Sequence, residues 1–270
     1  MRLAGRGADA LLDLRAAALH TGRRLDAAAA TAPIRDVLVL GVYVPDGAIT
    51  MAHSVRRLEA SRHRVRFALG ALGRPDPLLE RVTVLSDLTA GKLANVNRLA
   101  ERAHPGDADW VLLLDDDVDL GPGFLDRLLH LAEAFGLQLA QPALRRASHT
   151  AWEVTRRRPA LVRETRFVEM GPCTLMTGAV HRALSPFPEA GMGWGVDLHW
   201  AAVAQRRGWR VGVVDAVPVR HDTRPTASTY RWQDAIAVAH EFLARHEHLR
   251  YAEAERTLAT HTRLPPASAA

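Results

Sequence analysis

The sequence contains a single cysteine, Cys173, so it cannot form an internal disulfide bond. A chain without disulfides fits a reducing compartment. No stretch approaches the ~20 apolar residues that a membrane-spanning helix needs, and the longest apolar run, Val37 to Val44, has the length of a strand. Because Asp9 and Asp13 stand where a signal peptide is purely apolar, we predict a soluble, cytoplasmic protein without an integral membrane segment.

Lysine is nearly absent, since 34 of the 35 basic residues are arginine and one is Lys92. A codon bias against lysine explains the scarcity, and it makes the single exception a candidate functional residue. The net charge of +5 suits anionic small molecules or a membrane surface. The basic residues are spread along the chain with one short cluster at 156–158, whereas a dedicated nucleic-acid binder usually shows a basic stripe. We therefore expect no nucleic-acid partner.

The 270 residues are 48% hydrophobic and 24% charged, a composition that can bury a sizeable core and excludes disorder as the main state. Between residues 34 and 142, buried apolar segments alternate with amphipathic ones, which is typical of an open, mostly parallel α/β sheet flanked by helices. We predict an N-terminal accessory helix in residues 1–33, a main α/β domain in residues 34–222 and a C-terminal helical extension in residues 223–270.

The individual elements follow from hydrophobic periodicity and from turn residues. Strands are expected at 36–44, 64–71, 81–86, 110–114, 137–141, 167–177 and 210–219. Helices are expected at 8–30, 54–61, 93–103, 124–135, 197–207 and 229–258. The basic, poorly periodic residues 143–166 are expected to form a surface loop or mobile segment, and residues 222–228 a loop.

Three adjacent carboxylates, Asp115, Asp116 and Asp117, follow the most apolar strand in the sequence LLLDDDVDLGPG. Open α/β sheets bind ligands beyond the carboxyl ends of their strands, and adjacent carboxylates repel unless a cation or hydrogen-bond donors offset the repulsion. Hard oxygen ligands point to Mg²⁺ or Mn²⁺. Side-chain alternation puts Asp115 and Asp117 on one face of the strand, so this D-x-D pair is a candidate site for a metal that also holds a diphosphate.

The same cluster has two other interpretations. The first is a solvated acidic turn that holds no ligand. The second is the DDxxD pattern of prenyl-diphosphate enzymes, which Asp115, Asp116 and Asp119 also satisfy. That motif lies on a long helix of an all-helical protein, whereas here a strand precedes the aspartates and Gly-Pro-Gly follows them. We therefore reject the prenyl-diphosphate class.

Lys92 lies in the first turn of a predicted helix, within TAGKLANVNR at residues 89–98. A cation together with free backbone N–H groups at a helix N-terminus suits a phosphate group, and Asn95 adds a neutral donor. This segment is therefore a candidate phosphate site. The alternative is a solvated lysine beside a helix that faces the core.

The segment GMGWGVDLHW at residues 191–200 carries a tryptophan between glycines. Glycines let the backbone pass close to a ligand, and Trp194 could stack on the face of a sugar. Asp197 begins a predicted helix, where it is either an N-cap or a general base that points into the cleft. His221 follows the last predicted strand, where it is either structural or a third metal ligand.

The chain resembles nucleotide-sugar glycosyltransferases of the GT-A fold, and most closely those of family 2, over residues 36–222. The resemblance depends on the ordered series GKLANVN, DWVLLLDDDVDLGPGFL, FVEMGPCTLM, GMGWGVDLHW and VGVVDAVPVRH. It implies a Rossmann-like GT-A catalytic domain in residues 34–222 and a nucleotide-sugar donor as co-substrate. The chain departs from many family members after its second strand, which ends in LGALGRP without an acidic D-x-S-x-D stretch. Asp46 or Asp87 is expected to substitute for that stretch in the nucleotide site.

The resemblance also implies roles for individual residues on the nucleotide side. Asp115 and Asp117 match the metal-binding D-x-D, with Asp117 as the direct ligand. Asp116 matches the member nearest the nucleotide ribose, and Lys92 matches the residue that lies near the nucleotide. His221 matches the late histidine of some metal-dependent members.

On the side of the reacting sugar, Asp197 matches the acidic residue that acts as base in inverting members. Glu169, Trp194 and Gly195 would line the acceptor and donor-sugar side. We predict an inverting glycosyltransferase that uses Mg²⁺ or Mn²⁺ and acts on a small-molecule or glycan acceptor, with residues 143–166 and the C-terminal helix closing over the site.

Two alternative functions remain open. A sugar nucleotidyltransferase is disfavoured, because PDGAIT follows the first strand where that class more often shows a Gly-rich, basic loop. A non-catalytic nucleotide-sugar-binding protein of the same fold is disfavoured by the intact aspartate cluster.

Overall fold

The structure is a computed structural model that describes residues 2–221 and 231–265. Its strands are β1 (Asp36–Tyr43), β2 (Arg64–Ala71), β3 (Thr83–Leu85), β4 (Trp110–Leu114), β5 (Val118–Asp119), β6 (Leu139–Leu144), β7 (Val162–Thr165), β8 (Cys173–Thr177), β9 (Val211–His221) and β10 (Thr257–His261). Its α-helices are α1 (Arg2–Ala18), α2 (Thr21–Ala30), α3 (Ala48–Glu59), α4 (Lys92–Ala103), α5 (Phe124–Ala134), α6 (Gly178–Leu184), α7 (Val196–Arg207), α8 (Trp232–Arg245) and α9 (Tyr251–Ala254). Short 3₁₀ turns are η1 (Pro45–Gly47), η2 (Glu80–Val82), η3 (Pro105–Asp107) and η4 (Glu153–Thr155).

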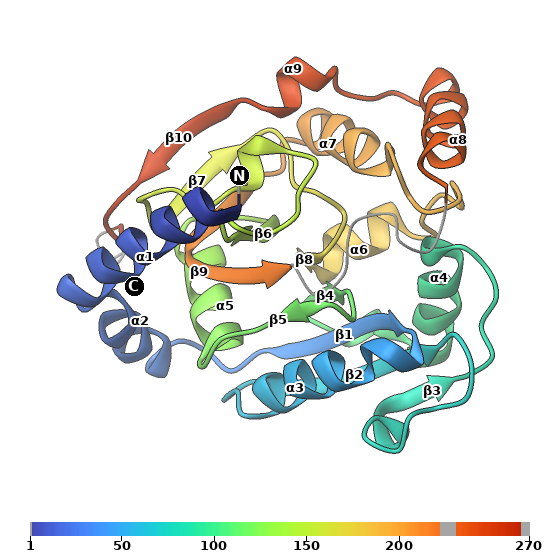
Figure 1. Cartoon of the computed structure of the whole chain (residues 1–270), viewed down its shortest axis with the longest axis horizontal. Coiled ribbons are helices and arrows are strands. Elements are labelled where there is room, and N and C mark those ends of the chain that lie inside the picture. The colour runs from blue at the N-terminus through green and yellow to red at the C-terminus, as the bar shows by residue number, and fades with distance from the viewer. Residues whose placement is uncertain (1, 222–230, 266–270) are drawn as a thin grey trace.

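The strands form one open sheet in the order β10-β7-β9-β6-β8-β4-β1-β2-β3, with β5 paired to β9 (Figure 1). The strands β1, β2, β3, β4, β6, β9 and β10 point one way, whereas β5, β7 and β8 point the other way. The predicted open, mostly parallel α/β sheet is therefore confirmed. Continuous apolar runs such as WVLLL build the central strands because helices cover both of their faces.

Alternate side chains along β1 supply the two faces of the sheet. Val37 and Val39 pack in a cluster with residues of α2, α3 and α5. Leu38 and Leu40 pack in a second cluster with residues of α4, α6, α7 and α8. The sheet is thus the middle of three layers. Within the described residues, no helix is long and apolar enough to cross a membrane.

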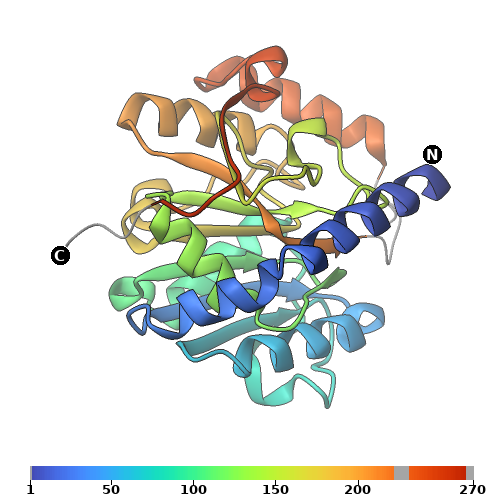
Figure 2. The same ribbon diagram turned by 90° about the vertical axis from the view of Figure 1, so that its left-hand side faces the viewer.

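The N-terminal segment forms two helices, so the single helix predicted over 8–30 is wrong. α1 ends at Ala18, and His20 adopts a left-handed conformation with φ of 49° before α2 begins at Thr21. α2 then packs on α5 and buries Leu25 and Ala29. Both helices lie across the outside of the domain in Figure 2.

Several predicted bounds shift in the structure. α3 begins at Ala48 rather than at residue 54, because the turn η1 leads directly into it. The strand predicted over 167–177 is shorter and begins at Cys173. The helix α6 follows it at once and had not been predicted.

Residues 143–166 are not a continuous surface loop, since they contain β7, η4 and the end of β6. A buried ion pair fixes the segment to β9: Arg163 Nε lies 2.8 Å from Asp215 Oδ2, and both side chains are fully buried. The same guanidinium donates to the carbonyls of Val154 at 2.7 Å and Arg156 at 2.8 Å. Buried polar groups that are paired in this way order the chain around them.

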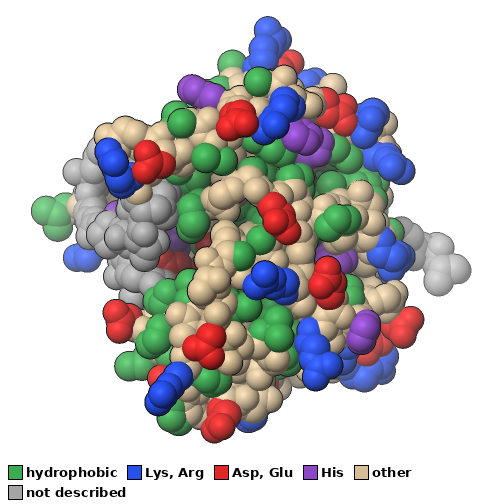
Figure 3. Space-filling view, turned by 90° about the vertical axis from the view of Figure 1, so that its right-hand side faces the viewer, with side chains coloured by type: hydrophobic (Ala, Val, Ile, Leu, Met, Phe, Trp, Pro, Cys, Tyr) green, Lys and Arg blue, Asp and Glu red, His purple; other side chains and the backbone are tan. Residues whose placement is uncertain are grey.

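The C-terminal residues do not form the single helix predicted over 229–258. After α8 and α9, the strand β10 pairs antiparallel with β7 and ends the sheet. Figure 1 shows this segment running along one side of the molecule and returning to the sheet. The loop predicted at 222–228 lies outside the described residues. On the face shown in Figure 3, acidic and basic side chains are interspersed.

Candidate active site

A cavity of about 410 Å³ opens beyond the carboxyl ends of β1, β4 and β9. Because these strands point the same way, the residues that follow them meet at one edge of the sheet. The predicted site residues that line the cavity are Lys92, Asn95, Asp115, Asp116, Asp117, Glu169, Trp194, Asp197 and His221. The volume is within the range of roughly 300–1,000 Å³ that is typical of small-molecule sites.

Asp115 and Lys92 form an ion pair inside the cavity. Lys92 Nζ lies 2.6 Å from Asp115 Oδ1 and 2.8 Å from Oδ2, and the backbone N–H of Asp115 donates to the carbonyl of Pro172. The only lysine of the sequence is thus placed against the acidic cluster. Since both side chains are partly exposed, an incoming ligand can reach either of them.

Asp116 is buried and connects the end of β4 to the turn after β1. Its Oδ2 accepts a hydrogen bond from the backbone N–H of Val44 at 2.9 Å. Gly47 lies so close that a Cβ at this position would overlap the Asp116 carboxylate. The glycine is therefore required by the close approach of the aspartate.

Asp117 and His221 meet because β5 pairs with the end of β9, which puts Val118 opposite His221. His221 Nε2 lies 3.3 Å from Asp117 Oδ1, and Nδ1 donates to the carbonyl of His149 at 3.2 Å. Burial opposes a charge on the ring, but the hydrogen bond with Asp117 and the negative charges of Asp117 and Asp115 outweigh it and raise the pKa of His221 to about 9.

The chemistry of these side chains fits a divalent cation. With Nδ1 donating to a carbonyl, Nε2 is the nitrogen that can ligate a metal. His221 Nε2 and Asp117 Oδ1, which lie 3.3 Å apart, would hold such a cation together. Among the described residues, however, no three His, Cys, Asp or Glu side chains form a preformed metal group, and Asp115 is paired with Lys92.

Asp197 lies in the first turn of α7 and is buried. The N-cap of this helix is Gly195, so the interpretation of Asp197 as the N-cap is wrong. Asp197 Oδ1 accepts a hydrogen bond from the backbone N–H of Leu198 at 2.9 Å. Burial outweighs this and other backbone donors and raises the pKa of Asp197 to about 7.

Glu169 is a second acid of the cavity. Its Oε2 accepts a hydrogen bond from Thr150 Oγ1 at 3.1 Å, and its backbone N–H donates to Gln141 Oε1 at 2.8 Å. Burial, followed by the negative charge of Asp197, raises the pKa of Glu169 to about 8. Two neighbouring acids with raised pKa values are therefore present on this side of the cavity.

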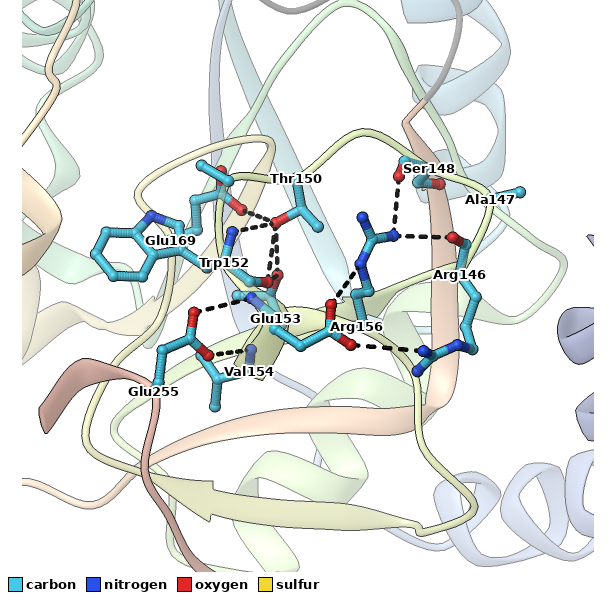
Figure 4. A network of polar contacts seen from close by, with 12 residues as sticks. Arg146, Ala147, Ser148, Thr150, Trp152, Glu153, Val154, Arg156, Glu169 and Glu255 are labelled. Atoms are coloured by element: carbon cyan, nitrogen blue, oxygen red, sulfur yellow. Dashed lines mark hydrogen bonds and ion pairs between the residues drawn. The ribbon is translucent and has the colours of Figure 1, made fainter. Parts of the chain in front are cut away.

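The wall beside Glu169 was not predicted from the sequence. Thr150 and Trp152 line the cavity, and Figure 4 shows Thr150 between Glu169 and the backbone of Trp152. Glu255 joins the same network by accepting from the backbone N–H groups of Glu153 and Val154. The tryptophan in an otherwise polar, arginine-rich stretch was the only available sequence signal.

Asn95 is buried in the cavity wall, where its Nδ2 donates to the carbonyl of Ala90 at 2.7 Å. Its Oδ1 has no hydrogen-bond partner among the described residues. The exposed carboxylates Asp46 and Asp87 and the glycine Gly195 are not among the described residues that line the cavity. Gly195 has a positive φ of 85° at the start of α7 and packs against α8.

Comparisons with known proteins place the fold in a class. No protein-family model and no curated protein matches the chain, but solved structures resemble it. GalNAc-T7 with UDP, GalNAc and Mn²⁺ matches with a TM-score of 0.56 and 11% identity, and the match covers 72% of this chain and 44% of that one. The chain thus spans less than half of GalNAc-T7.

Two further structures match over more of their length. Mannosyltransferase PcManGT from Pyrobaculum calidifontis, in complex with GDP-Man and Mn²⁺, has a TM-score of 0.56 and 13% identity over 94% of this chain and 78% of that one. TarS from S. aureus, in complex with UDP-GlcNAc, has a TM-score of 0.53 and 12% identity over 81% and 69%. The chain therefore has the GT-A fold of nucleotide-sugar glycosyltransferases, as predicted.

Proposed function

We propose that the protein is an inverting, metal-dependent glycosyltransferase that transfers a sugar from a nucleoside-diphosphate sugar to a hydroxyl group of a small-molecule or glycan acceptor. One observation carries the proposal: the buried acid Asp197 shares a cavity with Lys92 and with the three aspartates that follow β4. The acidic cluster suits the diphosphate end of the reaction, and the separate acid suits its acceptor end. We also propose a cytoplasmic location, in keeping with the single cysteine.

At the acceptor end, Asp197 is the general base. Its pKa of about 7 lets it be ionised near neutral pH and still accept a proton efficiently. The carboxylate takes the proton of the acceptor hydroxyl while that oxygen forms a bond to the anomeric carbon. The bond between the anomeric carbon and the diphosphate oxygen breaks, and its electron pair leaves with the nucleoside diphosphate.

At the diphosphate end, Asp117 and His221 are the proposed metal ligands, with Asp115 as a third once it separates from Lys92. When bound, Mg²⁺ or Mn²⁺ supplies positive charge that neutralises the leaving diphosphate. The ammonium group of Lys92 lies in the same cavity and adds a second cation. Asp116, through its bond with Val44, holds the turn that shapes the nucleotide end.

Around the reacting sugar, the wall formed by Thr150, Trp152 and Glu169 excludes water that would otherwise hydrolyse the donor. Trp194, which also lines the cavity, offers an aromatic face to the sugar. The pairing of Thr150 with Glu169 holds this wall in position.

Replacement of Asp197 tests the assignment of the base. We expect Asp197→Asn to lower the transfer rate by at least about tenfold, because a positioned base contributes roughly 10²- to 10⁴-fold. The same variant should bind the nucleotide as the wild-type protein does. Asp107→Asn is the matched control, since this exposed carboxylate of η3 is outside the described cavity lining, and it should retain full activity. Full activity of Asp197→Ala would contradict the assignment of Asp197 as the base. If the wild-type protein does not turn over any donor, a non-catalytic binding protein is favoured instead.

A further inference from the structure

The outer face of α1 is apolar. Leu3, Gly7, Leu11 and Leu14 recur at spacings of four, four and three residues, so they form one stripe along the helix. The leucines Leu3, Leu11 and Leu14 are 85%, 70% and 68% exposed. We call these four residues the leucine stripe. A surface helix normally turns its polar side outward, so this face is built to be covered.

The stripe cannot turn inward, because the opposite side of α1 is fixed to the domain. Asp9 is buried and accepts hydrogen bonds from the backbone N–H groups of Arg146 at 2.9 Å and Ala147 at 3.1 Å. Gly5 approaches the same backbone so closely that a Cβ would lie 2.8 Å from the carbonyl oxygen of Arg146. Asp13 makes ion pairs with Arg145 and Arg157, which further fixes the orientation of the helix.

Unpaired arginines lie on both sides of the stripe in α1, and others lie in α2. Arg6, Arg15, Arg23 and Arg24 are exposed, and no carboxylate of the described residues forms an ion pair with any of them. Both acids of α1, Asp9 and Asp13, are already bound to the domain. The outer side of α1 therefore combines exposed leucines with uncompensated positive charge, and Figure 2 shows this helix on the outside of the domain.

A second cavity, of about 100 Å³, opens between α1, α2 and residues 157–161 and 262–264. Four arginines surround it besides the paired Arg157: Arg15, Arg24, Arg158 and Arg263. Leu19, itself 53% exposed, lies at the end of α1 and lines the same cavity. The one carboxylate in its described lining, Asp215, is bound to Arg163, so the cavity is positive over an apolar floor.

We infer that α1 and α2 form a docking face for a lipid bilayer that contains anionic phospholipids. The leucine stripe enters the apolar boundary of the bilayer, the flanking arginines contact the headgroups, and the arginine-lined cavity accepts one phosphate. Interfacial helices combine these two features, and anionic leaflets attract basic segments. A second copy of the chain fits less well, because a two-fold interface on this stripe would bring the same arginines of two protomers together.

This docking has a consequence for the catalytic cavity. Arg146 and Ala147, which Asp9 holds, are followed three residues later by Thr150 in the cavity wall. The helix α1 therefore connects the docking face on its outer side to the segment that forms the acceptor side of the cavity. The inference goes beyond the proposed transfer reaction and does not depend on it.

Vesicle flotation with the full chain tests the inference. We expect the wild-type protein to float with vesicles that contain phosphatidylglycerol and not with vesicles of phosphatidylcholine alone. The double variant Leu11→Gln/Leu14→Gln should bind the anionic vesicles at least tenfold more weakly. The matched control is Leu78→Gln/Leu258→Gln, which removes two leucines of similar exposure, 52% and 56%, from other surfaces and should bind like the wild type.

The charged part of the face has its own test. Each of Arg15→Gln and Arg24→Gln should weaken binding about fivefold, since a basic residue near an anionic surface contributes about 1 kcal/mol, and 0.5 M salt should weaken wild-type binding further. No binding of the wild type to anionic vesicles at low salt would overturn the inference. So would equal losses in the stripe and control variants, or a wild-type dimer that Leu11→Gln/Leu14→Gln converts to monomer.

Discussion

The buried pair of Arg163 and Asp215 gives the sharpest prediction on stability. Neither side chain is exposed, and the guanidinium contacts the carboxylate twice, at 2.8 and 3.1 Å. Asp215→Asn keeps the shape and one acceptor oxygen but leaves the charge of Arg163 buried without a counter-charge. Breaking a buried pair on one side costs about 3–5 kcal/mol, and because the amide oxygen still accepts a hydrogen bond, we expect about 3 kcal/mol.

Two companion variants separate the destabilisation caused by an unpaired buried charge from the destabilisation caused by the loss of a contact. Arg163→Met/Asp215→Leu removes both charges, and such replacements are often neutral. Here the carbonyls of Val154 and Arg156 would lose their donor. The double variant should therefore recover only part of the free energy of unfolding that Asp215→Asn loses. Asp36→Asn breaks the exposed pair with Arg64 and should lower the free energy of unfolding far less than Asp215→Asn, because solvent screens exposed ion pairs.

The assay is urea unfolding followed by circular dichroism, with the slope of the transition checked for two-state behaviour. For a chain of this size, a loss of about 3 kcal/mol lowers the midpoint of thermal unfolding by roughly 6–12 °C. If Asp215→Asn and Asp36→Asn lower the free energy of unfolding equally, the ion pair of Arg163 and Asp215 does not fix residues 143–166 in the way the contacts imply.

Three further predictions concern the cavity. The transfer rate should rise with pH up to about 7 as Asp197 ionises, and Asp197→Asn should abolish this rise in a pH–rate profile. Because the pKa of Asp197 is raised in the folded protein, the unfolded chain releases this proton at a lower pH than the folded one. The free energy of unfolding should therefore fall between pH about 4 and 7, and it should fall less in Asp197→Asn. Gly47→Ala should displace Asp116 and lower nucleotide affinity measured by calorimetry, whereas Gly106→Ala, with no heavy atom within 4 Å of the added Cβ, should not. Lys92→Gln should weaken binding of a nucleoside diphosphate more than binding of the nucleoside in the same titration, because the lost cation faces the phosphates.

The parallel core of the fold could be predicted from the sequence because its strands are continuous apolar runs. Residues 36–43 and 110–114 are buried on both faces, and only a covered sheet tolerates such runs. The edge strand β10 could not be predicted in this way. Its alternation of partly buried and exposed side chains depends on pairing with β7, while the preceding Ala- and Glu-rich sequence favours a helix.

The break between α1 and α2 was also missed, since His20 takes its positive φ within residues 8–21, which contain neither proline nor glycine. A left-handed residue is ordinarily marked by glycine or asparagine.

The residues of the candidate site could likewise be predicted from the sequence only in part. Asp115, Asp116 and Asp117 could be placed because the strand before them is unmistakable and strand ends form ligand sites. Thr150 was missed because residues 143–166 lack periodicity, and their order comes from the pairing of Arg163 with Asp215, which lies 52 residues away in the sequence. Long-range pairs of this kind leave no local pattern.

The most direct test of the account is thermal unfolding with a panel of nucleoside diphosphates, UDP, GDP, dTDP and ADP, each with Mn²⁺ and with EDTA. A ligand that binds only the folded protein at ~100 times its Kd adds roughly 2.7 kcal/mol. We predict that one nucleotide raises the unfolding temperature by several degrees, and that the rise disappears in EDTA and in Asp117→Ala. An unchanged unfolding temperature with all four nucleotides would contradict the proposed metal–nucleotide site.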